Sequence, residues 1–160
     1  FITNLTLDQE GNTLLLYNLV EKHGKPLYDI LRSKAHKDRK VFFVSGAVGA
    51  DERERIREIT EGEKNAIIVA SLGTFSTGIN IRNLNNIIFA APTKSQIRVL
   101  QSIGRGLRRP DDNSMCRVYD VSDNLSWKRR KNYTMDHAID RLKIYQKEKL
   151  KHKLFEIPIS

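Results

Sequence analysis

The sequence has one cysteine, few aromatic residues and no long apolar run. A single Cys116 among 160 residues excludes a disulfide framework and a cysteine-rich zinc site. Because Cys116 lies within an apolar run, we expect a reduced thiol in the core, as is usual in a cytosolic protein. No apolar run approaches the roughly 20 residues that a membrane-spanning helix needs. We therefore expect no membrane partner.

Two motifs of nucleotide-hydrolysing enzymes are also missing. The sequence has no G-x-x-x-x-G-K-[ST] phosphate loop. It also lacks an Asp-Glu pair directly after an apolar strand, where magnesium could be held. We therefore do not expect the chain to hydrolyse a nucleotide by itself, and we expect no metal ligands of its own.

Positive charge is in excess. The chain has 28 Lys and Arg residues against 19 Asp and Glu, a formal net charge of +9. Its length suits one domain with a substantial core. A basic balance favours polyanionic partners, because binding them releases counterions. The alternative is a basic surface that only keeps the protein soluble.

Five short apolar runs predict strands, at residues 13–17, 41–44, 66–70, 86–90 and 116–121. The first four are almost continuously apolar, which is typical of parallel strands buried on both faces. Helical patterns separate them, at residues 26–35, 51–61 and 95–106, and Thr134 is predicted to cap a last helix. Strands that alternate with helices predict an α/β fold with a mainly parallel sheet of five or more strands. Such sheets bind ligands at the carboxyl ends of their strands.

The predicted helix at 95–106 and the residues just beyond it place Gln101, Arg105 and Arg108 on one face. Guanidinium groups bind phosphate oxygens in bidentate geometry and keep their charge. This face could present two arginines to a nucleotide held by another surface. The alternative is a basic helix end that complements the helix dipole.

A segment of small and hydroxylated residues, 71–78, follows the predicted strand at 66–70. Glycine lets backbone N–H groups approach an anion, and Ser and Thr hydroxyls add donors. We expect a loop here that binds phosphate. For Thr77 the cap of a turn or helix is the alternative.

In this order and spacing, the two segments resemble motifs V and VI of superfamily 2 helicases and translocases. The wording "FSTGINIRNL…KSQIRVLQSIGRGLRR" resembles phage UvsW-type DNA helicases, and it is also similar to the motor subunits of type I and type III restriction enzymes. The resemblance covers about residues 12–121. It implies a RecA-like three-layer sandwich at residues 1–121, the second motor domain of its family, with a basic loop and C-terminal helix at 122–160 packed on it. Relatives carry the phosphate loop on a preceding domain, and Phe1, Ile2 and Leu5 have the spacing of a cut helix. We therefore interpret the chain as part of a longer protein.

The resemblance implies an ATP-dependent helicase that moves 3′ to 5′ on forked or branched DNA, in DNA repair and recombination. ATP and Mg²⁺ would be shared with an N-terminal RecA-like domain, so the isolated chain would be inactive. We expect DNA as partner, RNA as an alternative, a monomer, and the cytoplasm of a bacterial or phage-infected cell. Two other functions stay open: a non-catalytic nucleic-acid-binding α/β module, and the motor subunit of a restriction enzyme.

The resemblance also implies roles for single residues. Arg105 and Arg108 would be arginine fingers, worth roughly three or more decades in rate, and Gln101 would sense the same phosphate. Nucleotide contacts would come from Thr77, Gly78, Asn80 and Gly104. Asn80 stands where many relatives carry Asp, and an amide cannot neutralise an arginine. Nucleic-acid contacts would come from Ser45, Gly46, Ser71, Thr74, Lys94, Lys128, Arg129 and Arg130, for which turn chemistry or a solvated basic surface is the alternative.

Overall fold

The structure is a computed structural model that describes residues 1–44, 50–75, 83–91, 116–124, 132–147 and 149–158. The chain divides into two compact units, Phe1–Val121 and Ser122–Ser160. Each unit is described by itself.

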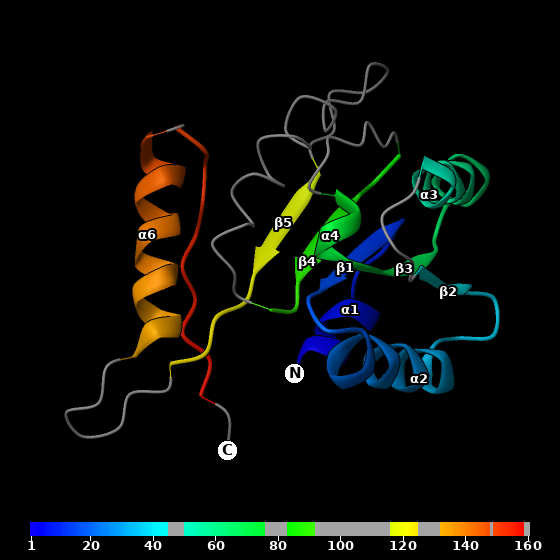
Figure 1. Cartoon of the computed structure of the whole chain (residues 1–160), viewed down its shortest axis with the longest axis horizontal. Helices are drawn as coiled ribbons and strands as arrows, with labels where there is room; N and C mark the ends of the chain where they lie inside the picture. Colours follow the sequence, from blue (N-terminus) through cyan, green and yellow to red (C-terminus); the bar gives the residue numbers. More distant parts are fainter. Residues whose placement is uncertain (45–49, 76–82, 92–115, 125–131, 148, 159–160) are drawn as a thin grey trace. The chain divides into compact units, whose positions relative to one another are not determined.

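The first unit is built on a sheet of five parallel strands (Figure 1). The strands lie in the order β2-β3-β1-β4-β5, and their bounds are β1 Thr13–Tyr17, β2 Val41–Val44, β3 Ile67–Ser71, β4 Asn86–Phe89 and β5 Arg117–Asp120. The predicted parallel α/β fold is therefore confirmed. Strand β3 begins one residue later than predicted, because the N–H of Ala66 donates to the Asn12 side chain at 3.0 Å.

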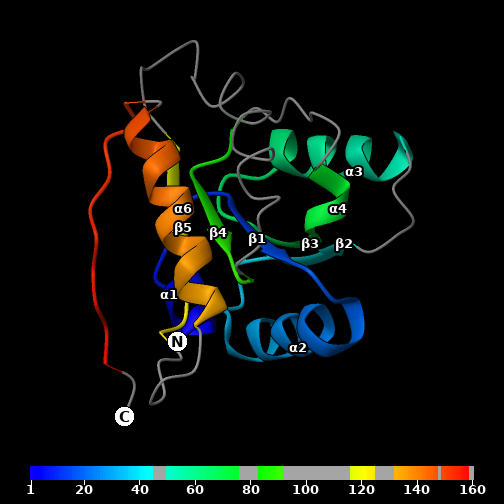
Figure 2. The ribbon, with the colours of Figure 1, turned by 60° about the vertical axis from the view of Figure 1, so that its left-hand side comes forward.

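Helices cover both faces of this sheet (Figures 1 and 2). On one face lie α1 (Ile2–Leu7), the short π-helix η1 (Val20–Gly24) and α2 (Lys25–Lys34). On the other lie α3 (Ala50–Gly62) and α4 (Leu72–Phe75). Helices α2 and α3 confirm the predictions at 26–35 and 51–61, whereas the predicted helix at 95–106 lies outside the described residues. The arrangement is a three-layer sandwich.

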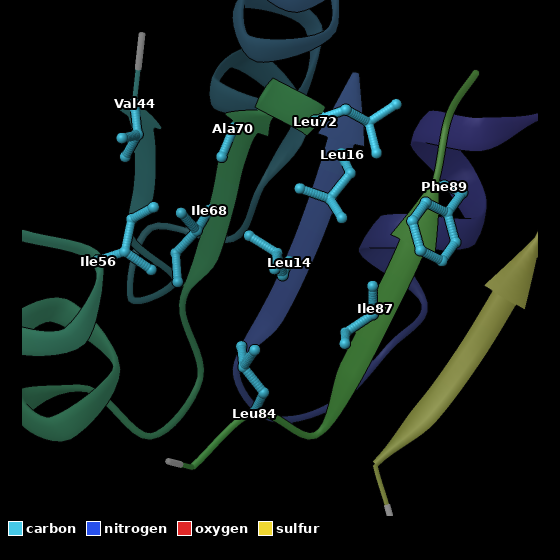
Figure 3. Close-up of a cluster of buried hydrophobic side chains, with 10 residues drawn as sticks. All are labelled: Leu14, Leu16, Val44, Ile56, Ile68, Ala70, Leu72, Leu84, Ile87 and Phe89. Atoms are coloured by element: carbon cyan, nitrogen blue, oxygen red, sulfur yellow. The ribbon is translucent and has the colours of Figure 1, made fainter. Parts of the chain in front are cut away.

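The alternation of side chains along β1 builds two cores. Leu14 and Leu16 belong to a cluster on the side of α3 and α4, where Ile56 of α3 and Leu72 of α4 face the sheet (Figure 3). Leu15 and Tyr17 belong to a second cluster against α1 and α2. Strand β1 is fully buried because it has a strand on each side and helices on both faces. This explains its unbroken apolar sequence.

Asn12 ties together the amino ends of the strands. Its side chain is buried, and Nδ2 lies 3.1 Å from the carbonyl oxygen of Thr60, 2.5 Å from that of Glu63 and 3.1 Å from that of Asn83. Its own backbone N–H donates to Oδ1 of Asn85 at 3.0 Å. One side chain thus joins the end of α3 to the starts of β1, β3 and β4. We call this set of contacts the amino-end network.

Arg39 adds a half-buried guanidinium at the same ends of the strands. Nη1 donates to the carbonyl oxygen of Leu7 at 2.8 Å, at the end of α1, and Nη2 lies 3.3 Å from Oγ1 of Thr13. Desolvation by burial lowers the pKa of Arg39 from its usual range. The group stays charged at neutral pH, because that range lies far above neutrality. Its charge complements the carbonyl end of α1.

The second unit contains α6 (Tyr133–Lys147) and the segment after it. The predicted cap, Thr134, is wrong by two residues. The side chain of Asn132 accepts from the N–H of Met135 at 3.3 Å and caps the helix, and the Thr134 hydroxyl instead lies 2.7 Å from the carbonyl oxygen of Asp123. Asn is the stronger cap of the two residue types. Within the helix, the buried Arg141 donates to Oγ of Ser122.

Candidate nucleotide and nucleic-acid site

The carboxyl ends of the five strands lie at one edge of the sheet, because all neighbouring strands pair in parallel. In the register of the sheet, Tyr17 of β1 is paired with Ser71 of β3, and Leu16 is paired with Ala70 and with Phe89 of β4. Ligands of open α/β sheets bind at this edge. The predicted site residues Ser45, Gly46 and Ser71 to Asn80 lie at or soon after the ends of β2 and β3 in the sequence, and the others follow β4 and β5 at a greater distance along the chain.

Two of the predicted site residues are described. Ser71 is the last residue of β3 and is half-buried. Thr74 lies on α4. The expected loop after β3 is therefore wrong over residues 72–75, which form a helical turn. The physical reason is Leu72, whose side chain is buried in the core on that face of the sheet and holds the chain close to the strand end.

The other predicted site residues lie outside the described residues. Their proposed roles stay predictions. They are Ser45, Gly46, Thr77, Gly78, Asn80, Lys94, Gln101, Gly104, Arg105, Arg108, Lys128, Arg129 and Arg130.

Tyr17 fixes the carboxyl end of β2 from two strands away. Its ring is fully buried and stacks on Phe43, with centroids 5.8 Å apart and planes 5° apart. Its hydroxyl donates to the carbonyl oxygen of Val44 at 3.4 Å. Val44 is the residue before Ser45, so this contact holds the point from which a predicted phosphate-binding segment begins.

The Tyr17 ring leaves no room for a side chain at residue 24. A Cβ at Gly24 would lie 2.5 Å from Cζ of Tyr17, inside any normal contact distance. Gly24 therefore serves packing, whereas the neighbouring His23 is exposed and its backbone N–H donates to Leu19 at 2.9 Å. Sequence reasoning missed the pairing of Tyr17 with Gly24. Its one signal was an aromatic residue that ends an otherwise aliphatic strand.

Cys116 comes one residue before β5 rather than within the strand. Its side chain is half-buried and packs against the cluster that contains Leu14. Within the described sheet, β5 is the last strand in the order.

The described part of the chain offers no cluster for a metal. No group of three or more His, Cys, Asp and Glu side chains that could hold a metal ion occurs among the described residues. In the same part of the chain, no helix is long and apolar enough to cross a membrane.

Comparison with curated proteins finds helicases. The chain is 34% identical over 154 residues to the ATP-dependent DNA helicase uvsW of Enterobacteria phage T4, covering 90% of this chain and 30% of the phage protein. It is 26% identical over 107 residues to the putative ATP-dependent helicase IRC3 of Saccharomyces cerevisiae, covering 66% of this chain and 15% of that protein. The chain thus spans less than a third of the length of either relative.

Solved structures show the same fold. The crystal structure of T4 UvsW matches with a TM-score of 0.67 at 34% identity, over 92% of this chain and 32% of that chain. The C-terminal domain of the DEAD-box protein Dbp5 matches with a TM-score of 0.57 at 17% identity, over 95% of this chain and 78% of that one. The second likeness shows the fold alone.

The model of one protein family matches residues 1–110, which is most of the first unit and includes Gln101, Arg105 and Arg108. The matched family is the helicase conserved C-terminal domain. Its match agrees with the parallel three-layer sandwich and with the identity to a phage helicase. The chain belongs to the helicase conserved C-terminal domain family.

Proposed function

We propose that this chain is the C-terminal motor domain of an ATP-dependent DNA helicase or translocase. The observation that carries the proposal is the family match over residues 1–110, which spans both helicase-like segments of the sequence. The phage relative is an ATP-dependent DNA helicase by name. The parallel sheet supports the proposal, because both segments follow the carboxyl ends of strands, where such folds bind ligands.

ATP would lie between this domain and an N-terminal RecA-like domain, and its hydrolysis would supply the free energy for movement. This chain would contribute positive charge. Arg105 and Arg108 would bind the γ-phosphate oxygens and stabilise the charge that develops there. Gln101, on the same face of the predicted helix, would hydrogen-bond in the same region. Asn80 would hydrogen-bond near the ribose without neutralising a guanidinium.

Nucleic acid would be held by its backbone. We propose that Ser45, Gly46, Ser71 and Thr74 donate hydrogen bonds to phosphates, since short hydroxyls and glycine N–H groups suit contacts that do not depend on sequence. Lys94, Lys128, Arg129 and Arg130 would add charge. Binding should therefore weaken steeply with salt. We extend the proposal to 3′-to-5′ movement on forked or branched DNA, as a monomer in the cytoplasm of a bacterial or phage-infected cell.

The test is the ATPase rate of the longer protein with substitutions at the predicted fingers. Arg105→Ala and Arg108→Ala should each lower DNA-stimulated turnover by about a thousandfold. Arg→Lys should rescue only in part, because an ammonium lacks the planar fork. Arg32→Ala is the matched control, since Arg32 is exposed on α2. Normal turnover in a finger variant removes that residue from the role.

A second candidate is a nucleic-acid-binding module without ATPase activity. The net charge of +9 favours it, because charge alone supports non-specific binding. It predicts that the longer protein carries no phosphate loop. The two candidates also differ in the finger variants: a binding module would lose affinity for DNA in them and would have no turnover to lose.

A further inference from the structure

Lysines recur at every second position from the last residue of α6 onward. They are Lys147, Lys149, Lys151 and Lys153, and all four are exposed. Among the described residues, none of the four takes part in a salt bridge. The second unit, residues 122–160, contains ten Lys and Arg against five Asp and Glu, so it supplies +5 of the net +9. The four exposed lysines at the end of α6 and just beyond it are part of this excess.

The chain reverses at Lys149 and returns beside α6 (Figures 1 and 2). The N–H of Leu150 donates to the carbonyl oxygen of Tyr145 at 2.9 Å, and Lys149 has a φ of 54°. This is the left-handed helix end at which glycine is usual. A lysine there places strain on the backbone.

The returning segment contacts α6 through His152. The His152 ring lies with its centroid 6.4 Å from that of the buried Tyr145. Residues 151–158 are in neither helix nor strand and run beside α6. Every residue from 149 to 158 is exposed, so the side chains of Lys149, Lys151 and Lys153 are all accessible.

An exposed aromatic residue follows the lysines. Phe155 comes two residues after Lys153, and its side chain is 75% exposed. An exposed ring beside a row of cations is the combination that binds single strands, in which phosphates meet the charges and a base stacks on the ring. Positions two residues apart on an extended chain are about 6.6 Å apart, which is the greatest spacing expected between Lys151 and Lys153.

We propose that Lys149, Lys151, Lys153 and Phe155, here called the lysine ladder, bind single-stranded nucleic acid. The choice of nucleic acid over an anionic lipid surface rests on the proposed function. The ladder belongs to the second unit and contains none of the residues assigned above to the motor domain. It would hold a strand by its phosphates and one base, without reading sequence.

The experiment measures binding of the chain to fluorescent oligo(dT) by anisotropy over a series of salt concentrations. Lys149→Gln, Lys151→Gln and Lys153→Gln combined should weaken binding roughly tenfold or more and lower the slope of log affinity against log salt by about two units. Lys22, Lys34 and Lys37, also exposed, changed together to Gln, are the control with the same loss of charge. If both triple variants behave alike, net charge explains the binding and the ladder is overturned.

Two single substitutions separate binding from structure. Lys149→Gly should leave thermal stability unchanged or higher, because glycine suits this φ, and should still weaken binding. Phe155→Leu should weaken single-strand binding by about fivefold or more and leave duplex binding unchanged, because a paired base cannot stack on the ring. Normal binding in both variants overturns the proposal.

A second experiment, with lipid vesicles, distinguishes nucleic acid from an anionic lipid surface as the partner. Vesicles containing phosphatidylserine are sedimented with the chain and with the lysine triple variant. Loss of sedimentation in the variant together with unchanged oligo(dT) binding would assign the ladder to a lipid surface and overturn the proposal. The outcome is independent of the ATPase test, because ladder variants should bind DNA poorly whether or not Arg105 and Arg108 act as fingers.

Discussion

The two ends of the parallel sheet use their polar side chains differently. At the amino ends, Asn12 and Arg39 direct their hydrogen bonds to backbone carbonyls of neighbouring segments. At the carboxyl ends, a buried tyrosine hydroxyl holds one strand, and the segments with the predicted site residues begin there. At the amino ends, the polar side chains are therefore used in hydrogen bonds within the chain. At the carboxyl ends, polar groups of this fold can instead bind a ligand.

This difference explains why asparagines cluster at one end of the sheet. Asn86 donates to the carbonyl oxygen of Glu10 at 2.7 Å, and Asn65 accepts from the N–H of Gly11 at 3.1 Å. Gly11 has a φ of 82°, and the side chain of Asn85 fills the space that a Cβ there would need. These residues form tight turns and hydrogen-bond backbone groups that would otherwise have no partner. Their clustering is explained by the fold, without a ligand.

Among the substitutions proposed here, we expect Asn12→Ala to lower the stability of the fold most, because it breaks the amino-end network. It removes a buried donor to three carbonyl groups and the acceptor of the Ala66 N–H. We expect the free energy of unfolding to fall by about 3 kcal/mol or more, since each buried group left unsatisfied costs about 1–3 kcal/mol. Urea denaturation measures this loss.

Asn65→Ala is the matched control, because its contact with Gly11 is exposed; we expect a loss below about 1 kcal/mol. The affinity of the folded fraction for oligo(dT) should be unchanged in both variants. A large loss of affinity in folded Asn12→Ala protein would contradict the separation of the two ends.

Gly24→Ala tests the packing at the carboxyl ends of the strands, and we expect an intermediate loss of stability. The added Cβ would press on the Tyr17 ring, and we expect a loss of stability of about 1–3 kcal/mol from overpacking. Thermal denaturation monitored by circular dichroism measures it. In a Tyr17→Leu background the same substitution should cost less, because the ring is gone. If Gly24→Ala instead keeps full stability and loses nucleic-acid affinity, then Gly24 contacts phosphate and not Tyr17.

Lys40→Gln should have the smallest effect, although it also acts near the amino ends. Nζ of Lys40 lies 2.6 Å from Oε1 of Glu63, but the lysine side chain is 63% exposed. Exposed ion pairs contribute less than about 1 kcal/mol, and salt screens them. Chemical denaturation at low and high salt measures the difference, with Lys37→Gln as the control without an ion pair. A loss above about 2 kcal/mol that persists in high salt would show that charge, as well as amide hydrogen bonds, holds this end of the sheet.

Much of the fold could be predicted because parallel strands leave a clear pattern. Residues 13–17 and 41–44 are strands at the predicted bounds, since buried strands show as unbroken apolar runs. The helical turn at 72–75 was not predicted. Its residues are small and polar in part, and the core position of Leu72 depends on the sheet behind it.

At the candidate site, the position of one residue along its strand could be predicted, while the roles of the predicted site residues stay predictions. Ser71 could be placed at a strand end, because a strand followed by small residues is a local signal. The roles of Tyr17 and Gly24 could not, because their contact joins a strand to a π-helix that begins three residues later and gives no periodic pattern. The cap at Asn132 was missed in favour of Thr134, since both residue types cap helices and only the geometry of the loop chooses between them.

The sequence by itself determined the α/β class, the parallel sheet, the excess of positive charge and the order of the helicase-like segments. These are properties of local pattern and composition, which need no knowledge of which segments touch. The tertiary structure alone decided that Asn12 joins three strands to α3, that Tyr17 excludes a side chain at Gly24, and that the lysine ladder turns back beside α6. Each depends on contacts between residues that are not neighbours in a strand or helix, and the sequence does not record such distances.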